Sequence, residues 1–207
     1  MSAIYQPSLA RRIVSRTAAA IGLRYYDVLY CERDLTAPAP QTVPELPVEL
    51  RVATGNDIEA MAALQSGDER RVVLEIAKRG VGFVAESEGG IIGYAWARAG
   101  AMHVFCRRPL EYFELAELPE GVCYTNNSYV LPSHRGRGVF QALLSFQYRD
   151  RRAAGFTAVT NLIESVNLDS LAAHRRLGHA TQPARIVKLP AQAPKLTYLA
   201  AGPSWAA

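Results

Sequence analysis

One stretch of the sequence, YVLPSHRGRGVFQALLSFQYRDRRAAG from Tyr129 to Gly155, restricts the fold more than any other. A short apolar run ends at a proline, and two glycines then lead directly into a long segment with helical spacing of apolar residues. A glycine within a helix costs about 1 kcal/mol relative to alanine, so this pair indicates a backbone that something approaches closely. Free amide N–H groups and the helix dipole would point the same way there. The stretch therefore predicts an anion-binding turn, with pyrophosphate as its natural ligand.

The stretch does not match the commoner phosphate-binding motifs. The sequence contains no G-x-x-x-x-G-K-[ST] motif of a Walker A loop. Gly136 and Gly138 are followed by Gln141, where a dinucleotide-binding fingerprint has a third small residue. Arg135 and Arg137 can add charge-assisted hydrogen bonds to a phosphate, although two arginines in a solvated turn would give the same pattern.

The charge balance permits several anionic partners. The net charge of +4 comes almost wholly from arginine, because Lys78, Lys188 and Lys195 are the only lysines among 207 residues. Such an excess suits nucleic acid, an anionic cofactor or an acidic substrate. We expect no nucleic acid as partner, because aromatic residues are not interleaved with a basic stripe in any known module.

The apolar and cysteine patterns indicate a protein of the reducing cytoplasm. No run approaches the roughly 18 apolar residues that span a bilayer, so no membrane span is expected. Cys31, Cys106 and Cys123 are an odd number without C-x-x-C spacing, which argues against a disulfide scaffold and a zinc site. We therefore expect a cytoplasmic location and no bound metal.

The chain divides into four parts by composition. Residues 1–36 form an extension in which an arginine-rich amphipathic helix precedes a strand; an organellar transit peptide is the alternative for the helix. Residues 37–47 are a proline-rich linker. Residues 48–190 form the main domain, and 191–207 a tail or last strand. This division predicts that the main domain folds without the extension.

The order of predicted elements places the main domain in the α/β (α+β) class. A strand at 48–54 is followed by two helices within 55–80 and a hairpin at 81–99. After an unassigned segment come a strand ending near Val130, a helix from Val139, a strand at 156–163 and a helix at 167–178.

Two motifs in this order resemble the GNAT superfamily of acyl-CoA-dependent N-acyltransferases. Arg135-Gly-Arg-Gly138-Val-Phe140 resembles the family's [Arg/Gln]-x-x-Gly-x-[Gly/Ala] signature and departs from it at Phe140. NLDSLAAHRRLGH resembles the family's second motif, N-x-x-[AS]-x-x-x-Tyr-x-x-x-Gly-Phe. Asn167, Ser170 and Gly178 are in register, and histidines take the tyrosine and phenylalanine places. The resemblance covers roughly residues 48–188.

The resemblance implies a mixed, mostly antiparallel central sheet flanked by helices. It also implies transfer of an acyl group, acetyl first, from acyl-CoA to an amine of a small molecule or peptide. The implied cofactor-binding residues are Ser128, Tyr129, Val130, Arg135, Gly136, Arg137, Gly138, Val139, Phe140, Gln141 and Asn167. Asn167 has helix capping as its alternative role. A homodimer is among the arrangements left open.

The catalytic residues follow less directly. His174 stands in the place of the family's proton-donating tyrosine, and its imidazole can donate a proton to the departing thiolate, although a surface or capping role fits as well. Glu164 is a candidate general base. Three further candidates precede the central strand, Glu111, Glu114 and Glu117, and a water relay would need no carboxylate.

Other functions remain open at this point. The enzyme alternatives are transfer of a longer acyl chain and transfer to a hydroxyl acceptor. A regulatory module that binds acyl-CoA without turnover is the alternative from another class, and release of free thiol distinguishes it from an enzyme. The acceptor, the acyl chain length and the role of the extension do not follow from the sequence.

Overall fold

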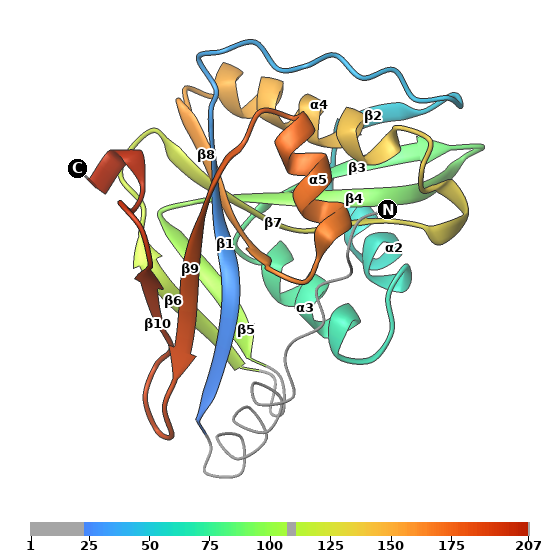
Figure 1. Ribbon diagram of the computed structural model, residues 1–207. Helices are drawn as coiled ribbons and strands as arrows, with labels where there is room; N and C mark the ends of the chain where they lie inside the picture. The colour runs from blue at the N-terminus through green and yellow to red at the C-terminus, as the bar shows by residue number, and fades with distance from the viewer. Residues whose placement is uncertain (1–22, 107–110, 207) are drawn as a thin grey trace.

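The computed structural model describes residues 23–106 and 111–206 (Figure 1). The predicted N-terminal helix lies outside these residues. The strands are β1 (Arg24–Asp34), β2 (Glu49–Val52), β3 (Val81–Ser87), β4 (Gly90–Ala99), β5 (Ala101–Cys106), β6 (Glu111–Glu117), β7 (Val122–Val130), β8 (Ala158–Glu164), β9 (Ala180–Lys188) and β10 (Lys195–Tyr198). The helices are α2 (Ile58–Ala63), α3 (Gly67–Ala77), α4 (Val139–Ala153) and α5 (Leu168–Arg176). None of these helices is long and apolar enough to cross a membrane.

Eight strands form one sheet in the order β10-β9-β1-β8-β7-β4-β3-β2, and β5 pairs with β6 in a separate hairpin. Every neighbouring pair in the large sheet is antiparallel except β7 and β8, which run parallel. Helices flank this sheet, so the predicted mixed, mostly antiparallel fold is confirmed. The hairpin β5–β6 occupies the segment that the sequence left unassigned.

The two faces of the sheet have different covers. Phe83 and Ala85 of β3 belong to the apolar cluster that includes α4, whereas the intervening Val84 packs with α2 and α3. This alternation is expected, because successive side chains of a strand point to opposite faces. On the same face as Val84, Tyr124 of β7 joins a cluster with residues of the hairpin β5–β6, Met102 among them. One face of the sheet therefore carries α4 and α5, and the other carries α2, α3 and the hairpin.

β1 is an interior strand, although it precedes the proline-rich segment. It pairs with β8 on one edge and β9 on the other. Tyr30 and Cys31 are both fully buried. Tyr30 packs in the cluster that includes the hairpin, and Cys31 packs against Leu171 of α5. We therefore propose that the extension from β1 onward folds together with the main domain.

The segment 37–47, called the strap below, lies along α4 rather than projecting away from it (Figure 1). Hydrogen bonds fix it at four points. Arg33 donates to the carbonyl oxygen of Pro38 at 2.7 Å, and Ser145 of α4 donates to that of Pro40 at 2.9 Å. Near the other end, the Glu45 amide donates to the Arg137 carbonyl at 3.0 Å, and Ser87 donates to the Pro47 carbonyl at 2.9 Å.

The place of β1 is testable with a pair of substitutions to aspartate. Cys31→Asp introduces an unpaired charge inside the sheet, which costs about 3 to 5 kcal/mol. For a domain of this size we expect the melting temperature to fall by roughly 10 °C. Gln41→Asp, at an exposed position in the segment that follows this strand, should leave the melting temperature within about 2 °C. Equal melting temperatures for the two variants would contradict an interior β1.

Candidate functional site

The two parallel strands at the centre of the sheet separate along their length. β7 and β8 pair only from Val122 to Tyr124 and from Ala158 to Thr160. β7 continues to Val130 and β8 to Glu164, each held on its outer edge by another strand. Beyond Tyr124 the inner edge of β7 therefore has no strand partner among the described residues. Backbone amide and carbonyl groups on that edge are free to bind a ligand.

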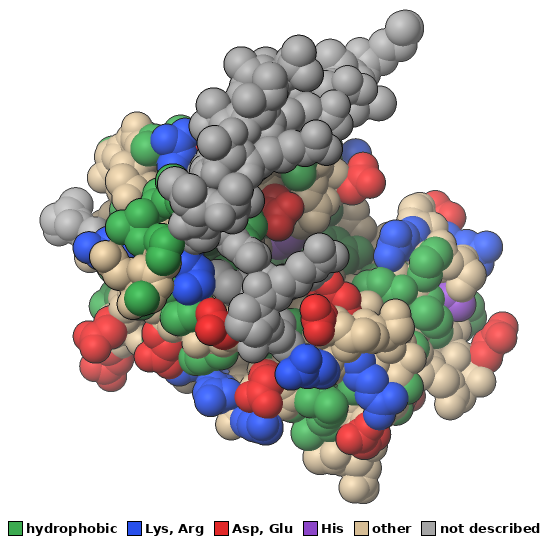
Figure 2. Space-filling model, turned by 90° about the horizontal axis from the view of Figure 1, so that it is seen from below, with side chains coloured by type: hydrophobic (Ala, Val, Ile, Leu, Met, Phe, Trp, Pro, Cys, Tyr) green, Lys and Arg blue, Asp and Glu red, His purple; other side chains and the backbone are tan. Residues whose placement is uncertain are grey.

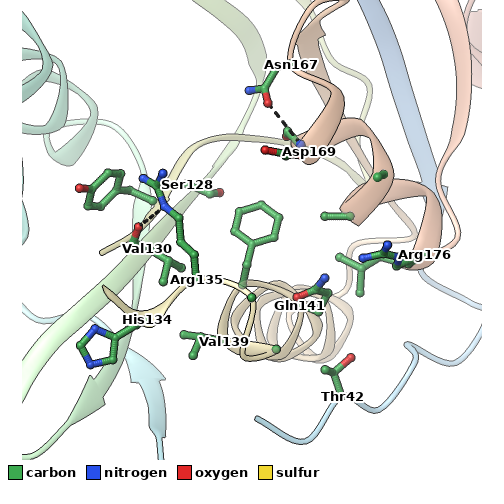
Figure 3. Close-up of a pocket in the computed structure, with 18 residues that line it drawn as sticks. Thr42, Ser128, Val130, His134, Arg135, Val139, Gln141, Asn167, Asp169 and Arg176 are labelled. Carbon is green, nitrogen blue, oxygen red and sulfur yellow. Dashed lines mark hydrogen bonds between the residues drawn. The ribbon is translucent and has the colours of Figure 1, made fainter. Parts of the chain in front are cut away.

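A pocket of about 820 Å³ lies at this opening (Figure 3). It is bounded by the end of β7, the glycine loop, the start of α4, one face of α5 and the strap. Among the residues predicted to bind the cofactor, those on its wall are Ser128, Tyr129, Val130, Arg135, Gly136, Gly138, Val139, Phe140, Gln141 and Asn167. The remaining predicted site residues, Arg137, His174 and Glu164, are not on the wall.

The glycine loop presents the N-terminus of α4 to the pocket. Gly136 and Gly138 have φ of 76° and 77°, a left-handed conformation that L side chains rarely adopt. Gly138 is the N-cap of α4, and no side chain caps this helix. The first amide N–H groups of a helix have no partner within it, so those of Val139, Phe140 and Gln141 are available to an anion.

The strap also restricts the space for a side chain at Gly138. A Cβ atom at this position would lie 3.4 Å from Thr42 Cγ2, the Val43 carbonyl oxygen and Pro44 Cα. The close approach inferred from the sequence is therefore made, on one side, by the protein's own strap. An interaction between residues this far apart along the chain leaves no local signal in the sequence.

The two arginines of the loop have different positions. Arg135 Nε donates to the Val130 carbonyl oxygen at 2.9 Å, and its guanidinium lies 5.4 Å from the centre of the Tyr129 ring. These contacts fix Arg135 against the end of β7, with the side chain still on the pocket wall (Figure 3). Arg137 contributes its backbone carbonyl to the strap, as the acceptor for Glu45.

Asn167 combines its two predicted roles. Its side-chain oxygen accepts a hydrogen bond from the Ser170 amide at 3.2 Å and so caps α5 (Figure 3). The same residue lies on the pocket wall. Capping orients the side chain but leaves its amide nitrogen free of hydrogen bonds within the described residues.

His174 is on the face of α5 that packs against Phe140 of α4, where it is buried and not on the pocket wall. Its Nδ1 lies 2.8 Å from the Ser170 carbonyl oxygen, which can only accept, so this nitrogen carries the proton of the neutral ring. Burial lowers the pKa of His174, which keeps the ring neutral and its Nε2 unprotonated. The ring packs against Phe140 and His179, with centres 5.8 and 4.9 Å away. These contacts favour a packing role over proton donation.

Glu164 lies at the exposed end of β8, on the other face of the sheet. It is paired in register with Val28, whose side chain packs with the cluster beneath the hairpin. Asn126 of β7 is opposite Trp96, which packs with α2 and α3 on that same face. Of the other carboxylates considered, Glu114 is paired with Arg98, and Glu111 lies 3.6 Å from Lys188.

A bulge in β7 places the polar residues Asn126 and Asn127, which this strand has in place of a carboxylate, beside the opening. Tyr129 is opposite Tyr94 and Asn126 is opposite Trp96, so three steps along β7 match two steps along β4. Within this bulge Asn127 has a φ of 46°. Asparagine adopts this left-handed backbone conformation more readily than most residues. The conformation is nevertheless strained, and such strain often marks a functional site.

A histidine of the hairpin holds one of these polar groups. Asn126 Nδ2 lies 2.6 Å from Nε2 of the buried His103. Within the described part of the chain, the other polar atoms of this group have no hydrogen-bond partner: Asn126 Oδ1, Asn127 Oδ1, His103 Nδ1 and Trp96 Nε1. Burial, aided by the nearby Arg98 and Arg79 and opposed by Glu114, lowers the pKa of His103 to about 4. Unsatisfied buried polar atoms beside an opening are groups that a substrate can satisfy.

Comparison with known proteins identifies the family to which this chain belongs. A family model described as "Acetyltransferase (GNAT) family" matches residues 53–179. A Drosophila protein of known structure has a TM-score of 0.58 at 14% identity, and a GCN5-related N-acetyltransferase from Sphaerobacter thermophilus has 0.55 at 20%. Each is matched over 86% of this chain and 56% of its own length, so this chain spans just over half of either protein.

A third similar fold is part of a much larger protein. It belongs to a fungal multi-domain β-N-acetylglucosaminidase with a GCN5-related glucosamine N-acetyltransferase region, with a TM-score of 0.55 at 14% identity. The match covers 89% of this chain and 23% of that one. At these identities the likeness concerns the fold alone. The sequence has no significant match among curated proteins.

The buried His103 predicts a loss of stability in acid. Its folded pKa of about 4 is below the value near 6.5 of an unfolded histidine, so protons bind preferentially to the unfolded chain. The contribution is complete above pH 6.5 and is lost as the pH falls toward 4, by about 3 kcal/mol in all. His103→Gln should therefore flatten the decline in unfolding free energy measured by denaturant titration over this range.

The control is His134, which lies on the pocket wall and outside the core. His134→Gln should keep the wild-type slope, because the two other buried histidines and His103 are unchanged. A His103→Gln profile parallel to that of His134→Gln would contradict the assignment.

Proposed function

Because the chain belongs to the GNAT acetyltransferase family, we propose that it transfers an acyl group, acetyl first, from acyl-CoA to an amine. The observation that carries this proposal is the pocket where β7 and β8 separate, with the free N-terminus of α4 at its edge. Loop amides from Gly136 to Gln141 suit the pyrophosphate of CoA. The inner edge of β7 at Ser128–Val130, which has no strand partner among the described residues and where Arg135 binds the Val130 carbonyl, suits the amide-containing arm that follows.

In this proposal the cofactor binds on one face of the sheet and the acceptor approaches from the other. The cofactor pocket is on the face of α5, whereas Asn126 and Glu164 belong to the face that carries the hairpin. An acceptor amine approaching from that second face reaches the thioester carbon through the gap between the strands. Its nitrogen forms the new C–N bond as the C–S bond breaks, and the proton lost by nitrogen is balanced by the proton gained by sulfur.

Glu164 is the group that we propose as general base for this step. It is exposed at the end of β8, on the acceptor face, and an ionised carboxylate can take the amine proton directly or through water. The Asn126 side chain, whose Nδ2 lies 2.6 Å from His103, is on the same face, and we propose that its Oδ1, which has no partner within the described residues, accepts a hydrogen bond from this amine. The amine is that of a small molecule or peptide.

The face of the molecule in Figure 2 gives little support to a nucleic acid as acceptor or partner. Seen from below, Lys and Arg side chains are interspersed with Asp and Glu (Figure 2). Proteins that bind the phosphodiester backbone gather their basic residues on one face.

The cofactor assignment is tested at Gly138. Acetyl-CoA at one hundred times its Kd should add about 2.7 kcal/mol to the free energy of unfolding, read as a rise in melting temperature. Gly138→Val should abolish most of this rise, because φ is left-handed and the added atoms meet the strap. Gly55→Val, where a side chain would have open space, should keep it. An undiminished rise in Gly138→Val would show that the loop has been misassigned.

The catalytic assignment is tested by comparing Glu164 with His174. Free thiol is measured with acetyl-CoA, longer acyl-CoAs and a panel of amines and alcohols. If none of these combinations releases thiol, the result would favour a binding module. With the amine that reacts best, Glu164→Gln should lower kcat at least tenfold at unchanged acetyl-CoA affinity. His174→Ala should lose about 2 kcal/mol of stability but keep kcat within threefold. The reverse pattern would restore His174 as the proton donor.

A further inference from the structure

One end of the pocket is lined by polar side chains from three different elements. The glycine-loop motif assigns no phosphate contact to any of these side chains. Thr42 comes from the strap, Gln141 from the first turn of α4 and Arg176 from the last turn of α5 (Figure 3). The carboxylate of Asp169 is also on the wall, but in the first turn of α5. Seven residues of helix separate it from Arg176, a rise of about 10 Å, so it does not neutralise the guanidinium.

Arg176 is a free cation on this wall. Its side chain is exposed, and among the described residues it forms no ion pair or hydrogen bond. Arg135, the other arginine on the wall, is already held by the Val130 carbonyl and the Tyr129 ring near β7. Arg137 is not on the wall at all. A guanidinium without a partner beside a pocket is suited to a phosphate, which it can bind through two parallel hydrogen bonds.

The strap holds Thr42 close to the same end. The buried Arg33 connects the strap to the end of α5. It donates both to the Pro38 carbonyl oxygen of the strap and to the Leu177 carbonyl oxygen next to Arg176. Thr42 Cγ2 would in turn contact a Cβ atom at Gly138, so its side chain lies beside the N-terminus of α4. The Thr42 hydroxyl has no hydrogen-bond partner in the described chain and can donate to an anion.

Acyl-CoA carries one phosphate more than the loop can bind. The amides of the loop and of α4 account for the pyrophosphate, whereas the 3′-phosphate on the ribose is a separate dianion. On the basis of the proposed function, we infer that Arg176 and Thr42 bind the 3′-phosphate of acyl-CoA. The strap is then a part of the cofactor site, which no motif in the sequence includes.

The test compares two ligands that differ only in this group, acetyl-CoA and acetyl-3′-dephospho-CoA, by isothermal titration calorimetry. Wild-type protein should bind acetyl-CoA more tightly. Arg176→Ala should weaken acetyl-CoA binding about tenfold and change binding of the dephospho ligand less than twofold. Thr42→Val should show the same selectivity at about threefold, and Thr42→Ser should restore wild-type affinity.

The matched control is Arg175→Ala, which removes the same charge from the neighbouring exposed residue of α5 that is not on the pocket wall. It should change neither affinity beyond twofold, because an exposed charge that is not on the pocket wall is screened by salt. Melting temperatures within about 2 °C of wild type would show that all four variants remain folded.

Three outcomes would overturn the inference. Equal losses of both ligands in Arg176→Ala would place the guanidinium on the pyrophosphate instead. Unchanged affinities in Arg176→Ala would remove it from the site while leaving the proposed function intact. Failure of wild-type protein to bind either ligand would overturn the proposed function, and this assignment with it.

Discussion

The short parallel pairing of β7 with β8 is the constraint on which the rest of the structure depends. Three residues of each strand are paired, and beyond them the sheet opens while β4 and β1 keep the outer edges in place. A gap in a sheet leaves backbone groups without partners, which is costly unless a ligand or water binds them. The bulge at Asn127 is in the ladder that pairs β7 with β4, along the part of β7 that has no β8 partner, and a bulge increases the local twist of its strand.

The end of the pocket beside the glycine loop depends on packing as well as on loop sequence. The strap passes so close to Gly138 that glycine is favoured there twice, by its φ and by the space available. Because Arg33 also bonds both the strap and the end of α5, the three elements around this end are tied together. A ligand that contacts all of them meets a preorganised wall, so little ordering cost is incurred on binding.

The three departures from the family motifs are neighbours in space. Phe140 occupies the place of a small residue, His174 that of a tyrosine and His179 that of a phenylalanine. The His174 ring packs edge to face against both of the others. The larger side chain on α4 fills volume beside the imidazole on α5, as close packing requires. His174 is thereby kept off the pocket wall, which is why we propose Glu164, on the other face of the sheet, rather than His174 as the group that transfers the proton.

Local patterns in the sequence determined the glycine loop, the order of strands and helices around it, and the family, because turns and periodicities depend on neighbouring residues. Only the tertiary structure decided that β1 is interior, that the strap lines the pocket and that His174 is buried. These features depend on contacts such as Arg33 with Leu177, between residues 144 positions apart. A contact of that kind arises from strand pairing and packing across the fold, and no local pattern in the sequence records it.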